Sequence, residues 1–334
     1  MLSLNNSHLQ LRCHAGGKFS FRTDISNGSL RFQRNKGSIP SQRRILAKSE
    51  EKSVQVLEDE NGRSTSRSFL SVLCPLLKLF AGGDPSKPRN EVLEMATSSL
   101  SSIARLPWGS TSLSGTMENR EYLDKPPELL QLFEFEACPF CRRVREAMTE
   151  LDLSIEVYPC PKGSIRHREV AKKIGGKELF PFLVDPNTGI SMYESGDIVK
   201  YLFKKYGHGR KPTFGLLEST LFTGWVPTLL RAGRGMTLWD KATRELPSSS
   251  EKLELFSYEN NPYARIVREA LCELELPYIL HNAGKGSSRY DLLVKSSGSS
   301  EVPYLIDRNT GAQISDYKSI VSYLFKTYST GTGN

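Results

Sequence analysis

A sixteen-residue segment occurs twice in this chain, 123 positions apart. Residues 132–147 read LFEFEACPFCRRVREA, and residues 255–270 read LFSYENNPYARIVREA. Apolar residues, a proline and several arginines are kept, whereas Cys138 and Cys141 become Asn261 and Ala264. We therefore interpret the shared residues as architecture and the differing ones as chemistry.

Each copy predicts the same order of elements: strand, helix, strand, helix, strand, strand, helix. In the first copy the expected strands are 129–135, 155–158, 180–185 and 190–193. Three helices are expected: the first begins at 138, the second spans 164–174 and the third spans 194–206. The sequence DPNTG at 185–189 is typical of a tight turn between the last two strands. The second copy follows with an offset of 123 that falls to 122 at VPYLID, residues 302–307. This regularity indicates duplication of a mixed α/β unit.

The net positive charge of the chain comes from its first 49 residues. Residues 1–49 hold nine Lys or Arg and one acid, which accounts for the whole formal charge of +8, so the rest is formally neutral. Nucleic-acid binding needs clustered positive charge on the folded part, and the sequence therefore argues against a nucleic-acid partner.

The first 49 residues are rich in Ser and Arg and lack the apolar core of a secretory signal. They predict a transit peptide and a location in the chloroplast, with the stroma favoured; the alternative is a disordered basic tail. Six cysteines are too few for a secreted disulfide scaffold of this length and fit a reducing compartment. No run of eighteen apolar residues occurs.

Composition divides the remaining chain. Residues 50–127 predict a mostly disordered linker with a helix over 90–105, and residues 128–207 predict the first domain. Residues 208–250 predict an interdomain helix and linker, and residues 251–330 the second domain. The apolar stretch 214–230 is typical of a buried or docking helix, and the alternative is weak membrane contact.

Cys-Pro-Phe-Cys-Arg-Arg at 138–143, between a strand and a helix, is a specific redox signal. Each repeat resembles the glutaredoxin branch of the thioredoxin-like fold and the N-terminal domain of glutathione S-transferases. The tandem arrangement resembles a group of plant chloroplast and cyanobacterial thioredoxin-family proteins. The resemblance implies an α/β fold of two tandem thioredoxin-like domains, each a mixed four-stranded sheet flanked by helices, after a disordered N-terminal region.

The thiols suggest a mechanism. A cysteine at a helix N-terminus faces unpaired N–H groups, which favour its thiolate, and Cys138 is that residue. Cys141 lies one turn further and is the expected resolving thiol. Arg142 and Arg143 either add a cationic field or are simply solvated. The predicted activity is glutathione-linked thiol–disulfide exchange on a disulfide-bonded or glutathionylated protein whose identity the sequence does not give.

The resemblance also implies a glutathione site, with glutathione as co-substrate. Pro181, after Phe180, resembles the family's cis-proline, whose backbone pairs with the cysteinyl part of glutathione. Glu194 and Ser195 resemble the acid–serine pair that binds the γ-glutamyl part; the alternative is that Ser195 is an ordinary helix cap. Phe135 stands where glutaredoxins commonly have a lysine.

The second repeat has no thiol at the matching positions and reads Asp316-Tyr317 in place of Glu-Ser, so we expect a structural or substrate-selecting domain. Cys272 is expected to be a buried small apolar residue.

Other functions remain open at this level. A zinc site could draw on Cys138, Cys141, Cys160 and His167, but the chain lacks a second Cys-x-x-Cys, and we predict no metal site. An iron–sulfur cluster bridging two chains is known among glutaredoxins. Two further alternatives are an isomerase resembling membrane-associated prostaglandin E synthase and a noncatalytic adaptor.

Overall fold

The computed structural model describes residues 84–87, 90–113, 126–243, 246 and 250–330. The transit peptide predicted over 1–49 and the first part, residues 50–83, of the linker predicted over 50–127 lie outside the described residues. Within the described ranges, no helix is long and apolar enough to cross a membrane.

The predicted order of elements is confirmed in both repeats. The first repeat contains β1 (Leu130–Glu134), α3 (Pro139–Glu150), β2 (Ile155–Pro159), α4 (His167–Gly175), β3 (Phe182–Asp185), β4 (Ile190–Met192) and α5 (Ser195–Tyr206). The second contains β5 (Leu253–Ser257), α8 (Pro262–Glu273), β6 (Tyr278–Asn282), α9 (Tyr290–Ser297), β7 (Tyr304–Asp307), β8 (Ala312–Ile314) and α10 (Tyr317–Thr327). Each repeat is a mixed α/β unit with one parallel and two antiparallel strand pairs.

The predicted turn between β3 and β4 is closed by a buried aspartate. The Asp185 carboxylate accepts hydrogen bonds from the Asn187 backbone and from the hydroxyls of Tyr201 and Tyr206 on α5. Three equivalent hydrogen bonds recur around Asp307 in the second repeat. The turn therefore fixes the last helix of each repeat against its hairpin.

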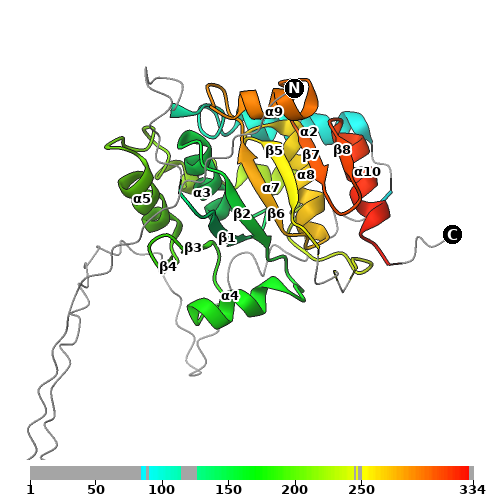
Figure 1. Ribbon diagram of the computed structural model, residues 1–334, viewed down its shortest axis with the longest axis horizontal. Helices are drawn as coiled ribbons and strands as arrows, with labels where there is room; N and C mark the ends of the chain where they lie inside the picture. The colour runs from blue at the N-terminus through cyan, green and yellow to red at the C-terminus, as the bar shows by residue number, and fades with distance from the viewer. Residues whose placement is uncertain (1–83, 88–89, 114–125, 244–245, 247–249, 331–334) are drawn as a thin grey trace, which may run out of the picture. The chain divides into compact units, whose positions relative to one another are not determined.

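The two repeats share one eight-stranded sheet, in the order β4-β3-β1-β2-β6-β5-β7-β8 (Figure 1). Strands β2 and β6 pair antiparallel, with Glu156 opposite Ile279. These two residues are equivalent in the duplication, being 123 positions apart, so a pseudo-two-fold axis passes between them. Without this pairing, β2 of the first repeat and β6 of the second would each be an exposed edge strand.

The core is also continuous across the repeats. One cluster of buried apolar side chains includes Met148 and Val157 from the first repeat and Leu271 and Leu280 from the second. Burial of this shared surface joins the repeats into one folding unit.

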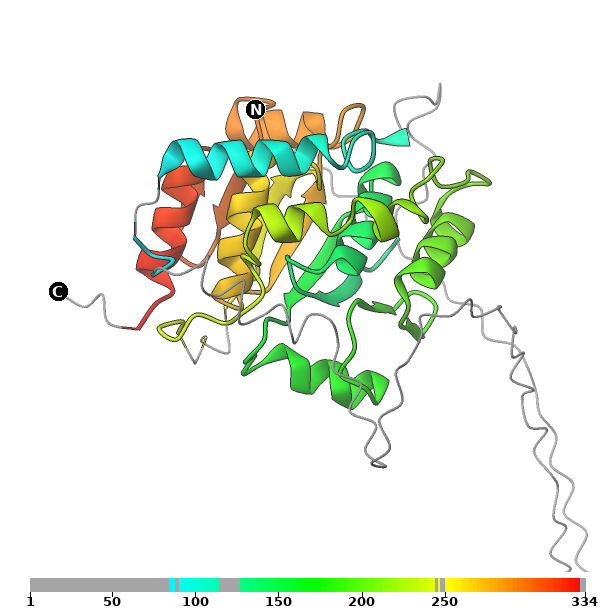
Figure 2. The ribbon, with the colours of Figure 1, turned by 180° about the vertical axis from the view of Figure 1, so that it is seen from behind.

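Two segments that the sequence assigned to linkers belong to the folded unit. Helix α2 (Glu91–Ile103) packs on α8, and the short helices α6 (Ser219–Phe222) and α7 (Val226–Leu230) replace the single helix expected over 214–230. Figure 2 shows α2 and α7 lying across the face that carries α3 and α8. We refer to residues 91–113 as arm 1 and residues 217–239 as arm 2.

The arms are themselves a repeat, with an offset of 126. Arg105 of arm 1 donates to Thr223 Oγ1 of arm 2 at 2.7 Å, and Arg231 of arm 2 donates to Thr97 Oγ1 of arm 1 at the same distance. Both members of each pair are equivalent by that offset. The duplicated unit is therefore an arm followed by an α/β domain.

Candidate functional site

Cys138 occupies the N-cap position of α3. Its backbone is extended, Pro139 takes the first helical turn, and the Cys138 sulfur accepts a hydrogen bond from the Cys141 amide at 3.4 Å. In the second repeat, Asn261 caps α8 in the same way, with its Oδ1 accepting from the Ala264 amide at 2.8 Å. The thiol thus stands where helix geometry provides donors for a negative charge.

The two thiols of the motif differ in acidity. Burial opposes ionisation of Cys138, but hydrogen bonds from the Cys141 thiol and from the Cys141 and Phe140 amides outweigh it, so the pKa of Cys138 is lowered. Burial and the neighbouring Cys138 raise the pKa of Cys141 well above its ordinary value. Cys138 is therefore the better candidate for the attacking thiolate.

Arm 2 covers the motif. Cys138 is only 2% exposed. Beside it, Thr228 Oγ1 donates to the carbonyl of Ala137 at 2.5 Å, and the Trp225 ring meets the Phe140 ring edge-on at 6.2 Å. The sequence-based mechanism needs a thiol that a substrate can reach, whereas here Cys138 is buried and arm 2 contacts residues on both sides of it.

The predicted glutathione residues lie next to the motif strand. The Phe180–Pro181 peptide is cis, as is Val302–Pro303 in the second repeat. Pro181 is buried, while the Phe180 ring meets the Phe135 ring edge-on at 6.3 Å. The guanidinium of Arg168 stands 5.1 Å from the centre of the Phe180 ring. A cation is therefore present on the side where Phe135 replaces the lysine of glutaredoxins.

Glu194 and Ser195 begin α5, and neither caps the helix through its side chain. Glu194 is exposed, and Ser195 is buried with its Oγ accepting from Arg143 Nη1 at 3.2 Å. Arg143 Nε donates to Thr220 Oγ1 of arm 2 at 2.6 Å, and Arg143 forms no ion pair within the described part of the chain. This arginine links the predicted γ-glutamyl site to arm 2.

Neither Arg142 nor Arg143 is solvated, since both side chains are buried. Arg142 donates to the Gly224 carbonyl of arm 2 at 2.9 Å. Arg265, its equivalent in the second repeat, donates to the Ser98 carbonyl of arm 1 at 2.7 Å. These arginines hold the arms over the two motif turns.

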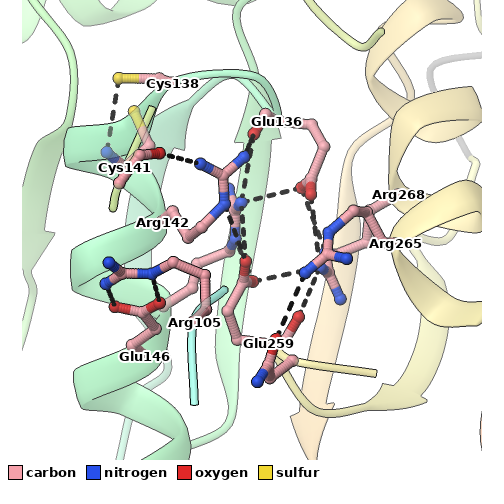
Figure 3. A network of polar contacts seen from close by, with 12 residues as sticks. Arg105, Glu136, Cys138, Cys141, Arg142, Glu146, Glu259, Arg265 and Arg268 are labelled. Carbon is pink, nitrogen blue, oxygen red and sulfur yellow. Dashed lines mark hydrogen bonds and ion pairs between the residues drawn. The ribbon is translucent and has the colours of Figure 1, made fainter. Parts of the chain in front are cut away.

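A buried ion cluster joins the repeats between α3 and α8 (Figure 3). Its members are Glu134, Glu136, Arg142, Arg145, Glu259 and Arg268. Arg145 Nε lies 2.7 Å from Glu259 of the other repeat. By the pseudo-symmetry, Arg268 Nε lies 3.1 Å from Glu136. Each repeat therefore neutralises the buried charge of the other.

The surrounding charges set the acidity of this cluster. Burial opposes ionisation of Glu259, but Arg145 and Arg268 outweigh it and lower its pKa to about 2. Burial lowers the pKa of Arg265, next to the cluster, to about 9. Sequence reasoning missed the cluster, although most of its members are kept in both copies of the duplicated segment.

Two further arginines attach the arms to the motif helices. Arg105 binds Glu146 of α3 through two hydrogen bonds of 2.8 and 2.6 Å, and Arg231 binds Glu269 of α8 through bonds of 2.8 and 2.7 Å. Glu146 and Glu269 are equivalent residues. The signal in the sequence was Arg-x-x-x-Gly-x-Thr at 105–111 and 231–237, which is short and easily overlooked.

Within the described residues, the other two cysteines, Cys160 and Cys272, are buried. Cys160 Sγ donates to the Tyr158 carbonyl at 3.4 Å, and His167 Nδ1 contacts the Pro159 carbonyl at 2.8 Å. Burial raises the pKa of both Cys160 and Cys272. Cys272 is buried in α8, as expected. Among the residues described, no group of three His, Cys, Asp or Glu side chains is placed to hold a metal ion.

Comparison with known proteins identifies the domains. No curated protein matches the chain. Among solved structures, a glutathione transferase of Bombyx mori matches with 23% identity over 25% of this chain and 38% of that one, at a TM-score of 0.21. The match therefore spans well under half of that protein. The family model of the glutathione S-transferase N-terminal domain matches residues 132–212 and again residues 255–332. The chain thus carries the N-terminal domain of glutathione S-transferases twice, as two thioredoxin-like units.

Proposed function

We propose that this chain is a glutathione-linked thiol–disulfide oxidoreductase, with Cys138 as nucleophile and Cys141 as resolving thiol. The observation that carries the proposal is the hydrogen bonding at the start of α3, which lowers the pKa of Cys138 while that of Cys141 is raised. Domains of this family imply glutathione binding in general.

The chemistry is disulfide exchange. The Cys138 thiolate attacks the glutathione sulfur of a glutathionylated protein, forming a Cys138–glutathione disulfide and releasing the protein thiolate. A second glutathione thiolate then attacks that disulfide, giving glutathione disulfide and restoring Cys138. Alternatively, Cys141 loses its proton and attacks Cys138, releasing glutathione and leaving a Cys138–Cys141 disulfide that two glutathiones reduce.

The co-substrate site includes Pro181, Phe180, Glu194 and Ser195. The exposed carboxylate of Glu194 suits the γ-glutamyl ammonium group, and Ser195 at the start of α5 suits its carboxylate. Arg143, buried beside Ser195 with hydroxyl partners, adds a positive charge for that carboxylate.

Turnover requires arm 2 to move, because Cys138 is buried beneath it. Near its start the arm carries the exposed apolar side chains of Leu221 and Phe222, and Phe214 lies just before it; all three are more than two-thirds exposed. We propose that an apolar segment of the protein substrate binds these side chains and displaces the arm. Weak membrane contact through 214–230 is a further use of the same surface, and the proposed location is the chloroplast stroma.

Turnover of a glutathionylated peptide, with glutathione as reductant, tests the proposal. We expect Cys138→Ser to abolish turnover, because the nucleophile is lost. Cys141→Ser is expected to retain part of it, because glutathione itself can resolve the mixed disulfide. Equal turnover by the wild type and both variants would refute the assignment.

The burial of Cys138 favours a second candidate, a noncatalytic adaptor in which both repeats serve as binding surfaces. The two functions differ in their dependence on sulfur. An adaptor would keep its partner after Cys138→Ser and lose it after charge is introduced at Leu221 or Phe222.

A further inference from the structure

The two repeats differ at the place where the last helix meets the motif helix and the arm. In the first repeat, Arg143 fills this place and bonds to Ser195 and Thr220. The equivalent residues in the second repeat are Ile266, Tyr317 and Glu94, by offsets of 123, 122 and 126. There the long cationic side chain is missing, and a cavity of about 340 Å³ is present.

The cavity is built from α2, α8 and α10 and from the segment before α2. Its apolar lining comes from Pro85, Ile266, Tyr317 and Val321. The Tyr317 ring is supported by the Tyr263 ring, at 5.3 Å between centres. A volume of this size lies within the range of small-molecule pockets. The cavity belongs to the repeat that lacks the Cys-x-x-Cys motif, so it is separate from the proposed activity of Cys138.

Most charged groups in the lining already have partners. Lys318 binds Glu91 at 2.5 Å, and Glu94 binds Arg231 at 2.6 Å. Arg234 likewise binds Glu273, which lies outside the lining, at 2.8 Å. Lys87 lines the cavity without forming an ion pair to any residue that the structure describes. The ammonium group of the exposed Lys87 side chain is therefore available to an anionic ligand.

We infer that this cavity binds a small organic anion with an aromatic or aliphatic body. The body would pack on Ile266, Val321 and Tyr317, and the anionic group would pair with the Lys87 ammonium. In the first repeat the guanidinium of Arg143 occupies the equivalent space. The inference thus gives the second repeat a binding role of its own.

Fluorescence titration of the full chain with anilinonaphthalene sulfonate, an anionic aromatic probe, tests this inference. Lys87→Glu is expected to weaken binding at least about tenfold, because it reverses the charge of the lining cation that forms no ion pair with the residues described. Ile266→Arg, which introduces the residue of the first repeat, should abolish binding by filling the cavity. The exposed Lys295→Glu on α9 is the charge-matched control and should bind like the wild type.

Several results would overturn the inference. One is unchanged affinity in both Lys87→Glu and Ile266→Arg, which would place the probe on exposed side chains such as Phe222. Another is equal binding of the uncharged analogue phenylnaphthylamine, which would exclude recognition of an anion. Displacement of the probe by millimolar glutathione would show a polar peptide ligand instead. Lys87 is exposed on the segment before α2, so we expect Lys87→Glu to fold. Its result can therefore be read even if Ile266→Arg fails to fold.

Discussion

At the scale of single residues, Cys138 and Asn261 show how duplication separates structure from chemistry. Both side chains cap the first turn of the motif helix, and both accept the amide three residues on. An asparagine performs this structural task without reactivity, whereas a thiol in the same position gains acidity from the donors. The cap is therefore common to both repeats, and only the first has a thiol at this position.

Substitution of Glu259 tests how much the buried ion cluster contributes to the free energy of unfolding. Glu259 lies 2.7 Å from Arg145 and 3.2 Å from Arg268, and all three side chains are buried. Glu259→Gln removes the negative charge and leaves buried guanidinium groups uncompensated, so we expect a loss of about 3–5 kcal/mol in the free energy of unfolding. Urea denaturation at pH 7 measures it.

Glu178→Gln is the matched control, because the Arg168–Glu178 pair is partly exposed and its loss should cost less than about 1 kcal/mol. The pKa of Glu259 is lowered from 4.5 to about 2, so its contribution is complete above pH 4.5 and is lost as the pH falls toward 2. The gap between wild type and Glu259→Gln should therefore narrow only below that pH. Equal losses in the two variants would contradict the role given to the cluster.

At the scale of elements, the arms explain why the repeats are larger than the family domain. Each arm pairs with the domain of the other repeat through backbone bonds: Ser112 N to Lys285 O at 2.8 Å in arm 1, and Leu238 N to Lys162 O at 2.9 Å in arm 2. Each arm also binds its own domain through Arg105 or Arg231. Each arm therefore connects the two repeats by binding to the domains of both.

Substitution of Gly235, in the turn of arm 2, tests whether arm 2 packs against the ion cluster. The φ of Gly235 is +71°, and an added Cβ would lie 2.7 Å from Glu136 Cβ in the ion cluster. Gly235→Ala therefore adds a clash to backbone strain, and we expect a loss of about 3 kcal/mol or more in thermal or urea unfolding.

The control is Gly189→Ala in the β3–β4 turn. Gly189 has nearly the same φ, +68°, but no atom lies within 4 Å of an added Cβ. Only the backbone strain remains, at a cost of about 1–2 kcal/mol. Should both variants lose the same stability, arm 2 would not be packed against the cluster as described.

At the scale of the whole molecule, the elements of each domain could be predicted because their signals are local. Alternating apolar residues, the DPNTG turn and Pro139 each act within a few residues. The pairing of β2 with β6 could not be predicted, because an edge strand and an interior strand can share the same alternation. The buried arginines and glutamates were missed for a related reason, since charged residues on a helix are usually solvated.

The candidate site was predicted in part. The N-cap position of Cys138 follows from motif spacing, and the cis peptide before Pro181 agrees with what the family resemblance implies. The cover by arm 2 depends on contacts such as Thr228 with Ala137, 91 positions apart, which leave no pattern in the sequence. Sequence reasoning therefore predicted the position of the Cys138 thiol at the helix start but not the contacts of arm 2 around it.

We propose that Cys138 is an acidic thiol whose access is controlled by arm 2. Native-state labelling with iodoacetamide, read for each cysteine by mass spectrometry, tests it most directly. The double variant Thr228→Val and Trp225→Ala removes two contacts of arm 2 with the motif turn, and Ser102→Ala at the equivalent place in arm 1 is the control.

We predict that loosening arm 2 raises the labelling rate of Cys138 about tenfold at pH 7, with the control unchanged and with Cys160 and Cys272 unlabelled in all forms. Because the pKa of Cys138 is lowered from 9.0, its labelling should reach half of its maximum below that pH. Equal labelling rates of Cys138 in the wild type, the double variant and Ser102→Ala would contradict control of access by arm 2. A half-maximal labelling rate above pH 9 would contradict the lowered pKa of Cys138.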